Sequence, residues 1–149
     1  MAGRFRIDWL LVDELAIGPA PRADRHLDRM TEQGIASVLS LCSEQEAQPP
    51  EGLAARFVCR RLVLPDHSSG RLLQIEELRA ALEQLEQLMP DGPVFVHCVA
   101  AVERSPLVCM AWLVQRHRQS PQVALDYLMQ AHPGTNPLPG QLKLLQLLD

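Results

Sequence analysis

Long apolar runs and a positive charge surplus are missing from this sequence, and its first residues are not expected to form a secretory leader. No apolar stretch approaches the roughly 18 residues that indicate a transmembrane helix. The first eight residues contain two arginines and an aspartate but no apolar core of a secretory signal. A formal net charge of -4 argues against a general nucleic-acid-binding face. We therefore expect a cytoplasmic protein that binds neither a membrane nor nucleic acid.

Cysteine is scarce and unpaired in sequence. There is no CxxC pair and no metal-ligand spacing among the four, which are Cys42, Cys59, Cys98 and Cys109. Three of them lie in apolar runs, which is typical of reduced core residues in a cytosolic protein. The sequence thus predicts no metal site and no cofactor. A redox partner for Cys98 among the other three stays open as an alternative.

The chain lacks internal repeats and low-complexity linkers, and its 149 residues suit one domain spanning 1–149. Short β-branched runs and helical spacing of three and four alternate along it, which indicates an α/β fold. We predict a central sheet of four or five mostly parallel strands, flanked by helices. Strands are expected at 5–11, 14–17, 35–42, 57–64 and 94–96, and helices at 24–34, 72–89, 107–114, 120–132 and 142–148. The polar stretch 43–52 is expected to be an exposed connection.

One stretch carries the chemistry: His97-Cys98, five further residues, then Arg104-Ser105-Pro106. A buried strand precedes it, and Ser105 with Pro106 predicts a helix start, Ser105 as the N-cap and Pro106 at the first helical position. The intervening loop would lie where a helix amino end attracts anions. Such surroundings favour the thiolate of Cys98 over the thiol. Arg104 supplies a planar fork for two oxygens of a phosphoryl group, and Ser105 can hydrogen-bond the sulfur when it leaves.

This order of residues resembles the signature of cysteine-dependent protein tyrosine phosphatases, in particular the small dual-specificity phosphatases. The resemblance implies Cys98 as the nucleophile that forms a phosphocysteine and Arg104 as the phosphate clamp. It also implies a phosphate-binding loop between strand and helix, made of His97, Val99, Ala100, Ala101, Val102, Glu103 and Arg104. The expected partner is a phosphorylated protein or peptide, and we expect a monomer.

A second catalytic group is needed, because the leaving oxygen must gain a proton and water must later lose one. In the resembled family an aspartate about thirty residues before the nucleophile does both, and Asp66 has the matching position. The alternative is that Asp66 simply forms a turn after Pro65.

Two positions depart from the resembled pattern. Ala101 stands where glycine is usual, and a left-handed backbone there would cost alanine about 1–2 kcal/mol. Glu103 places a negative charge in a loop expected to bind an anion. Both bear on the turnover rate.

Several functions remain open from the sequence. The loop positions 99–102 carry no lysine, so inositol phospholipids are less favoured as substrates than phosphoprotein. A lipid or small-molecule phosphatase stays an alternative, as does a catalytically weak phosphoprotein-binding module. A sulfurtransferase or an arsenate reductase could use a similar loop, but Asp66, the five-residue spacing and the missing resolving cysteine argue against them.

Overall fold

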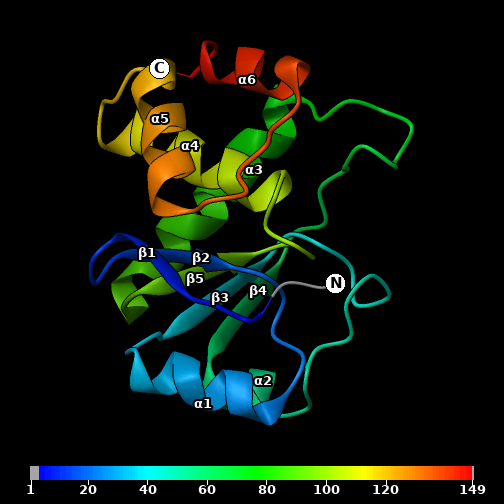
Figure 1. Ribbon diagram of the computed structural model, residues 1–149, viewed down its shortest axis with the longest axis vertical. Helices are drawn as coiled ribbons and strands as arrows, with labels where there is room; N and C mark the ends of the chain where they lie inside the picture. Colours follow the sequence, from blue (N-terminus) through cyan, green and yellow to red (C-terminus); the bar gives the residue numbers. More distant parts are fainter. Residues whose placement is uncertain (1–3, 149) are drawn as a thin grey trace.

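The strands form one five-stranded sheet in the order β1-β2-β5-β3-β4 in the computed structural model (Figure 1), which describes residues 4–148. Only the β1–β2 pair is antiparallel, and the other three pairs are parallel. This confirms the predicted α/β class with a mostly parallel sheet. The strands are β1 (Asp8–Leu11), β2 (Leu15–Gly18), β3 (Ser37–Ser40), β4 (Val58–Arg61) and β5 (Val94–His97).

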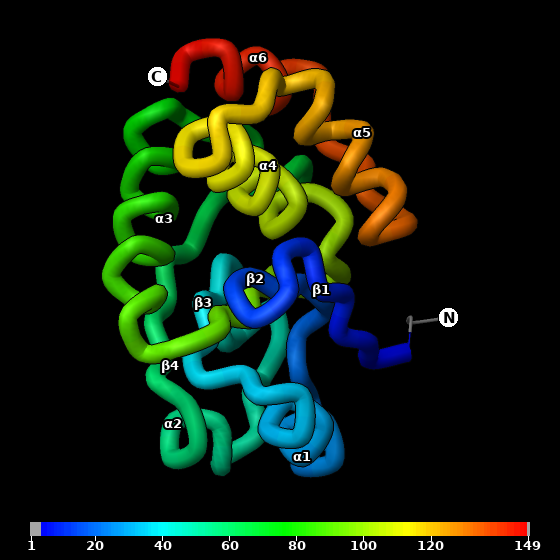
Figure 2. The backbone as a smooth tube through the Cα atoms, turned by 90° about the vertical axis from the view of Figure 1, so that its left-hand side faces the viewer, coloured from blue at the N-terminus to red at the C-terminus, as the bar shows by residue number. Residues whose placement is uncertain are grey.

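Helices cover both faces of this sheet. Two of them, α1 and α2, lie on one side, and α3 to α6 lie on the other (Figure 1, Figure 2). The first pair is α1 (Asp24–Glu32) and α2 (Leu53–Arg56). The second group is α3 (Ile75–Leu88), α4 (Arg104–Arg116), α5 (Pro121–Ala131) and α6 (Pro139–Leu145), with a 3-10 turn η1 (Met89–Asp91) after α3.

The central strand β5 shows why its sequence is apolar throughout. Val94 and Val96 belong to the core beneath α3 to α6, whereas Phe95 packs into a separate core with Leu27 and Met30 of α1. Successive side chains of a strand point to opposite faces, and here both faces are covered. Strand β5 is therefore buried between the two layers of helices, and its last residue, His97, lies inside the fold.

The helix that follows is anchored over its first ten residues, 104–113, all of which are buried. It begins at Arg104, with Glu103 as the N-cap residue. The prediction that Ser105 caps this helix is wrong, and Pro106 is the third helical residue. The Ser105 hydroxyl instead lies 3.2 Å from the sulfur of Cys98, which competes for the oxygen that a cap would need.

Other differences lie at element ends. Strands β1, β3 and β4 are shorter than predicted, β2 is shifted by one residue and β5 is one residue longer. Strand β4 is an exposed edge strand. The one-turn helix α2 was not anticipated, and α6 begins at Pro139, three residues before the predicted start. The helix expected at 120–132 is observed as α5, and Ser120 caps it, since its hydroxyl accepts a hydrogen bond from the Val123 N–H at 3.2 Å. Within residues 4–148, no helix has the length and hydropathy to cross a bilayer.

Candidate active site

Cys98 lies at the point where β5 ends and a loop of residues 98–103 leads into α4. Its side chain is buried, and its Sγ lies 3.2 Å from the Ser105 Oγ. The hydroxyl can donate to a thiolate, which accepts only. The cysteine and the serine are seven positions apart and meet because the loop closes on itself between them.

Four carbonyl groups of this loop accept hydrogen bonds from neighbouring segments. His97 Nδ1 donates to Cys98 O at 2.8 Å, and the Ala20 N–H donates to Val99 O at 3.0 Å. His132 Nε2 donates to Ala101 O at 2.6 Å, and the Asn136 N–H donates to Val102 O at 2.8 Å. In a planar peptide unit the N–H points away from the C=O. Within the described chain, none of the N–H groups of residues 99–103 donates to a backbone carbonyl. Such a run of free amides is suited to an anion.

Ala101 adopts the left-handed conformation, with φ of 59°. The strain expected for alanine at this position is therefore present, and it costs about 1–2 kcal/mol. The side chain is buried, 1% exposed, and does not line the cavity described below.

Arg104 is fixed by acceptors on three sides. Its guanidinium donates to both carboxylate oxygens of Glu46, at 2.8 Å and 3.3 Å, and to the carbonyls of Leu41 and Leu64, at 3.4 Å and 3.1 Å. The hydrogen bond from Arg104 lowers the pKa of the Glu46 carboxyl. A bidentate pair of this kind sets the plane of the guanidinium, so Arg104 is oriented before any ligand binds.

Asp66 lies on the loop after β4, beside this guanidinium, with its Oδ2 3.6 Å from an Arg104 nitrogen. Its other oxygen accepts hydrogen bonds from the Ser68 hydroxyl at 2.7 Å, the Ser68 N–H at 3.0 Å and the Ser69 hydroxyl at 3.1 Å. The bond from the Ser68 side chain is the main cause that lowers the pKa of the Asp66 carboxyl. The Asp66 side chain therefore stabilises the turn after Pro65 and also lies beside Arg104, so the two alternatives offered by the sequence are both present.

Glu103 is not left as an isolated negative charge. One oxygen lies 3.0 Å from His67 Nδ1, and the other accepts from the Gln141 amide at 3.1 Å. The hydrogen bond to Glu103 raises the pKa of the exposed His67 imidazole. These contacts tie the Asp66 loop and α6 to the loop of residues 98–103.

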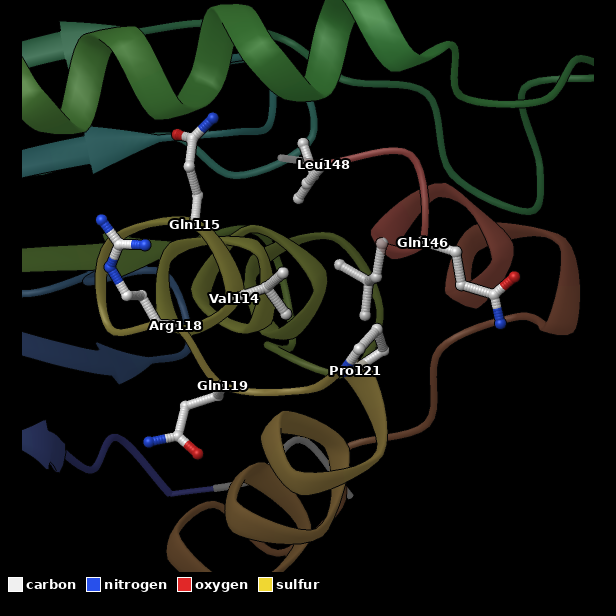
Figure 3. Close-up of a pocket in the computed structure, with 8 residues that line it drawn as sticks. Val114, Gln115, Arg118, Gln119, Pro121, Gln146 and Leu148 are labelled. Carbon is white, nitrogen blue, oxygen red and sulfur yellow. The ribbon is translucent and has the colours of Figure 1, made fainter.

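A cavity of 400 Å³ joins these groups. It is lined by Glu46, Asp66, His67, Cys98, Val99, Ala100, Val102, Glu103 and Arg104. A hollow of 630 Å³ lies near the other end of α4, lined in part by Val114, Arg118 and Pro121 (Figure 3), and contains neither a nucleophile nor an acid. Within residues 4–148, no group of three or more His, Cys, Asp or Glu side chains is arranged to hold a metal ion. The 400 Å³ cavity is therefore the candidate site.

The sequence profile of the family described as "Dual specificity phosphatase, catalytic domain" matches residues 17–148. The chain belongs to this family. Among curated relatives, the dual-specificity phosphatase domain is 22% identical over 139 residues to phosphatidylglycerophosphate phosphatase PTPMT2 of Arabidopsis thaliana, covering 93% of this chain and 61% of that protein. It is 39% identical over 46 residues to dual specificity protein phosphatase 2 of Mus musculus, covering 31% of this chain and 14% of that one. The chain thus spans less than two thirds of these relatives.

Solved structures agree with this dual-specificity phosphatase fold. The active form of Tk-PTP superposes with a TM-score of 0.80 at 22% identity, covering 95% of each chain. The human tyrosine phosphatase-like serine/threonine/tyrosine-interacting protein gives a TM-score of 0.80 at 21% identity, covering 95% of this chain and 93% of the other. PTPMT1 in complex with PI(5)P gives a TM-score of 0.77 at 19% identity, covering 90% and 88%.

The structure brings together most of the predicted site residues. Cys98, Arg104 and Asp66 line one cavity, as do Val99, Ala100, Val102 and Glu103, and Ser105 contacts the sulfur from within α4. His97 does not line the cavity. Its buried imidazole accepts from the Ser40 hydroxyl at Nε2, 2.7 Å away, and burial lowers its pKa to about 4. It holds the Cys98 carbonyl and is not placed to touch a substrate.

Glu46 is a site residue that sequence reasoning missed, because it lies in the stretch treated as an exposed connection. A signal was present: Ser43 and Glu46 have the S-x-x-E spacing of a capping box. The structure contains the reciprocal bonds, from Ser43 N–H to the Glu46 carboxylate at 2.8 Å and from Glu46 N–H to the Ser43 hydroxyl at 3.2 Å. This turn delivers the Glu46 side chain to Arg104. His132 and Gln141 were missed for lack of any local signal.

Proposed function

We propose that this chain hydrolyses phosphate monoesters through a cysteinyl-phosphate intermediate. The observation that carries the proposal is that Cys98, the pre-oriented Arg104 and four loop residues with free amides, Val99, Ala100, Val102 and Glu103, line one cavity. These groups suit an oxyanion whose charge is stabilised in the transition state by fixed donors.

In the first step the Cys98 thiolate attacks phosphorus, the S–P bond forms, and the P–O bond to the leaving group breaks. Asp66 gives its proton to the leaving oxygen. Arg104 and the loop amides hold the three equatorial oxygens. The Asp66 carboxylate, left ionised, is then placed to act as a base.

In the second step water attacks the phosphocysteine. Asp66 takes a proton from the water, the S–P bond breaks, and inorganic phosphate leaves. The Ser105 hydroxyl, 3.2 Å from the sulfur, donates to the thiolate as negative charge returns to it. Cys98 is then a thiolate again, and Asp66 again carries the proton that it needs for the next cycle.

The charge of the cavity supports a phosphorylated protein as the substrate. Its basic side chains are Arg104 and the exposed His67, and they stand beside three carboxylates, Glu46, Asp66 and Glu103. Such a balance suits a single phosphoryl group on a tyrosine, serine or threonine side chain. It is less suited to a headgroup with several phosphates, which needs additional cations.

A phospholipid monoester is the second candidate, because of what related proteins are named for. Two Arabidopsis relatives, PTPMT2 and PTPMT1, are phosphatidylglycerophosphate phosphatases, and they cover 93% and 84% of this chain. A headgroup of that type carries one phosphomonoester, which the cavity charge allows.

The reaction class is tested by metal-free hydrolysis of para-nitrophenyl phosphate between pH 5 and 8, with and without vanadate. We expect activity in the wild type that vanadate blocks and that Cys98→Ser abolishes. A folded wild-type chain without activity would contradict the proposal. Phosphopeptide binding in that case would identify a binding module.

Phosphate release then separates the two substrate classes. Phosphotyrosine and phosphoserine/threonine peptides are compared with phosphatidylglycerophosphate in mixed micelles, using Cys98→Ser as the blank. A higher kcat/KM for the peptides supports a protein phosphatase. A higher value for the lipid contradicts that choice and supports the second candidate.

A further inference from the structure

His132, the C-cap residue that follows α5, reaches the back of the loop of residues 98–103. It is 1% exposed. Its Nε2 lies 2.6 Å from the Ala101 carbonyl oxygen, and its Nδ1 lies 2.6 Å from Oδ2 of Asp8 on β1. Neither His132 nor Asp8 lines the cavity that contains Cys98. The imidazole therefore touches the loop without touching the ligand space.

Both ring nitrogens of His132 face acceptors. A carbonyl oxygen only accepts, so Nε2 must carry a hydrogen. The Asp8 carboxylate also accepts from Arg6 Nε, 2.8 Å from the same Oδ2. The imidazole is therefore held between Asp8 and the phosphate-binding loop, with Nε2 as the donor to Ala101.

The peptide unit that His132 holds includes the strained residue. Ala101 has φ of 59°, a conformation that glycine adopts at little cost and alanine does not. The loop can relax if nothing holds Ala101, and relaxation would turn the following amides away from the anion. The hydrogen bond from His132 Nε2 to the Ala101 carbonyl opposes this, because it fixes the peptide unit that follows the strained φ angle.

We propose that His132, oriented by Asp8, is a positioning residue for the phosphate-binding loop. It holds Ala101 in the left-handed conformation, so that the loop amides stay directed at the oxyanion without a glycine at that position. This inference deepens the proposed phosphatase activity and rests on it for its catalytic consequence. The contact itself is independent of that activity.

Two variants separate the contact with Ala101 from the contact with Asp8. His132→Gln can place an amide donor near the Nε2 position, toward Ala101, whereas His132→Asn can place one only near Nδ1, toward Asp8. We expect kcat/KM for para-nitrophenyl phosphate to fall about tenfold in H132N and by less in H132Q. Each is also made with Ala101→Gly, which removes the strain that His132 opposes. In that background the loss caused by H132N should shrink to about threefold or less.

A merely structural role would give a different pattern. H132N would then lower kcat/KM by the same factor with alanine or glycine at position 101, and that result would overturn the proposal. Equal losses in H132N and H132Q would overturn the assigned direction of the donor. Thermal unfolding of all variants identifies effects that come from global instability. If H132N does not fold, H132Q takes its place in the comparison with the wild type.

Two readouts do not depend on turnover. Nitrogen-15 spectra of the imidazoles, with His132 assigned by its disappearance in H132Q, should show a hydrogen on Nε2, and a tautomer with its hydrogen on Nδ1 alone would contradict the proposal. Tungstate affinity, measured by calorimetry, should weaken in H132N and recover in the double variant. If the wild type bound tungstate but hydrolysed nothing, the function would fail while these two tests still decided the role of His132.

Discussion

Glu46 and Arg104 form a two-point ion pair at the edge of the cavity, 58 positions apart in the chain. Glu46→Gln keeps the shape of the side chain but removes its charge and one of its two acceptor oxygens. We expect kcat/KM for an aryl phosphate to fall about tenfold, because Arg104 loses its fixed orientation. Steady-state kinetics and tungstate affinity measure this. Glu44→Gln, on the same exposed turn, is the matched control, and an equal effect there would contradict the assignment.

The Ser105 hydroxyl should act in the second chemical step. In Ser105→Ala the sulfur loses the donor that stabilises it as a leaving group, so we expect kcat to fall about tenfold while formation of the phosphocysteine is little changed. Rapid-quench or stopped-flow kinetics should then show a larger burst of para-nitrophenol. Ser120→Ala, at the cap of α5, serves as a control for stability. A burst slowed as much as the steady state would count against this role.

The pH dependence of the first step should follow Asp66. The Ser68 hydroxyl hydrogen bond lowers the Asp66 pKa, so Ser68→Ala should raise it. More of the acid is then protonated at neutral pH, and the alkaline limb of kcat/KM for phenyl phosphate should move to higher pH. Ser69→Ala should move it less, since Ser69 lies farther from the carboxylate. In Asp66→Asn the limb should vanish, and an unchanged profile there would remove Asp66 from the mechanism.

Acidification should destabilise the fold through His97. Burial lowers the pKa of His97 to about 4 in the folded chain, against about 6.5 for an exposed histidine. The unfolded state thus binds more protons between these values, and stability falls as pH drops through 6.5 toward 4. Between pH 7 and pH 5 the loss from this group is about 2 kcal/mol. Urea unfolding at both pH values measures it, and His97→Asn should show a smaller loss; an equal loss would assign the effect to other groups.

Short sequence patterns were sufficient to predict the reactive residues of the site. The β-branched run before Cys98, the spacing to Arg104 and the position of Asp66 after β4 each predicted a contributor to one cavity, and the cavity contains them all. The apolar segment after Ser105 likewise predicted a buried helix, as α4 is. The Ser105 cap was wrongly predicted, because a Ser-Pro pair favours capping only when the hydroxyl has no nearer partner.

What the sequence alone determined is the set of reactive groups and the α/β alternation that surrounds them. The tertiary structure decided which side chains, distant in the sequence, hold those groups in place. Glu46 meets Arg104 and His132 meets Ala101 because parallel strands end at one edge of the sheet and α5 returns over the loop. Contacts between residues 31 or 58 positions apart leave no periodic trace in a single sequence. They exist only once both faces of the sheet are packed, since that packing places the two partners within hydrogen-bond distance.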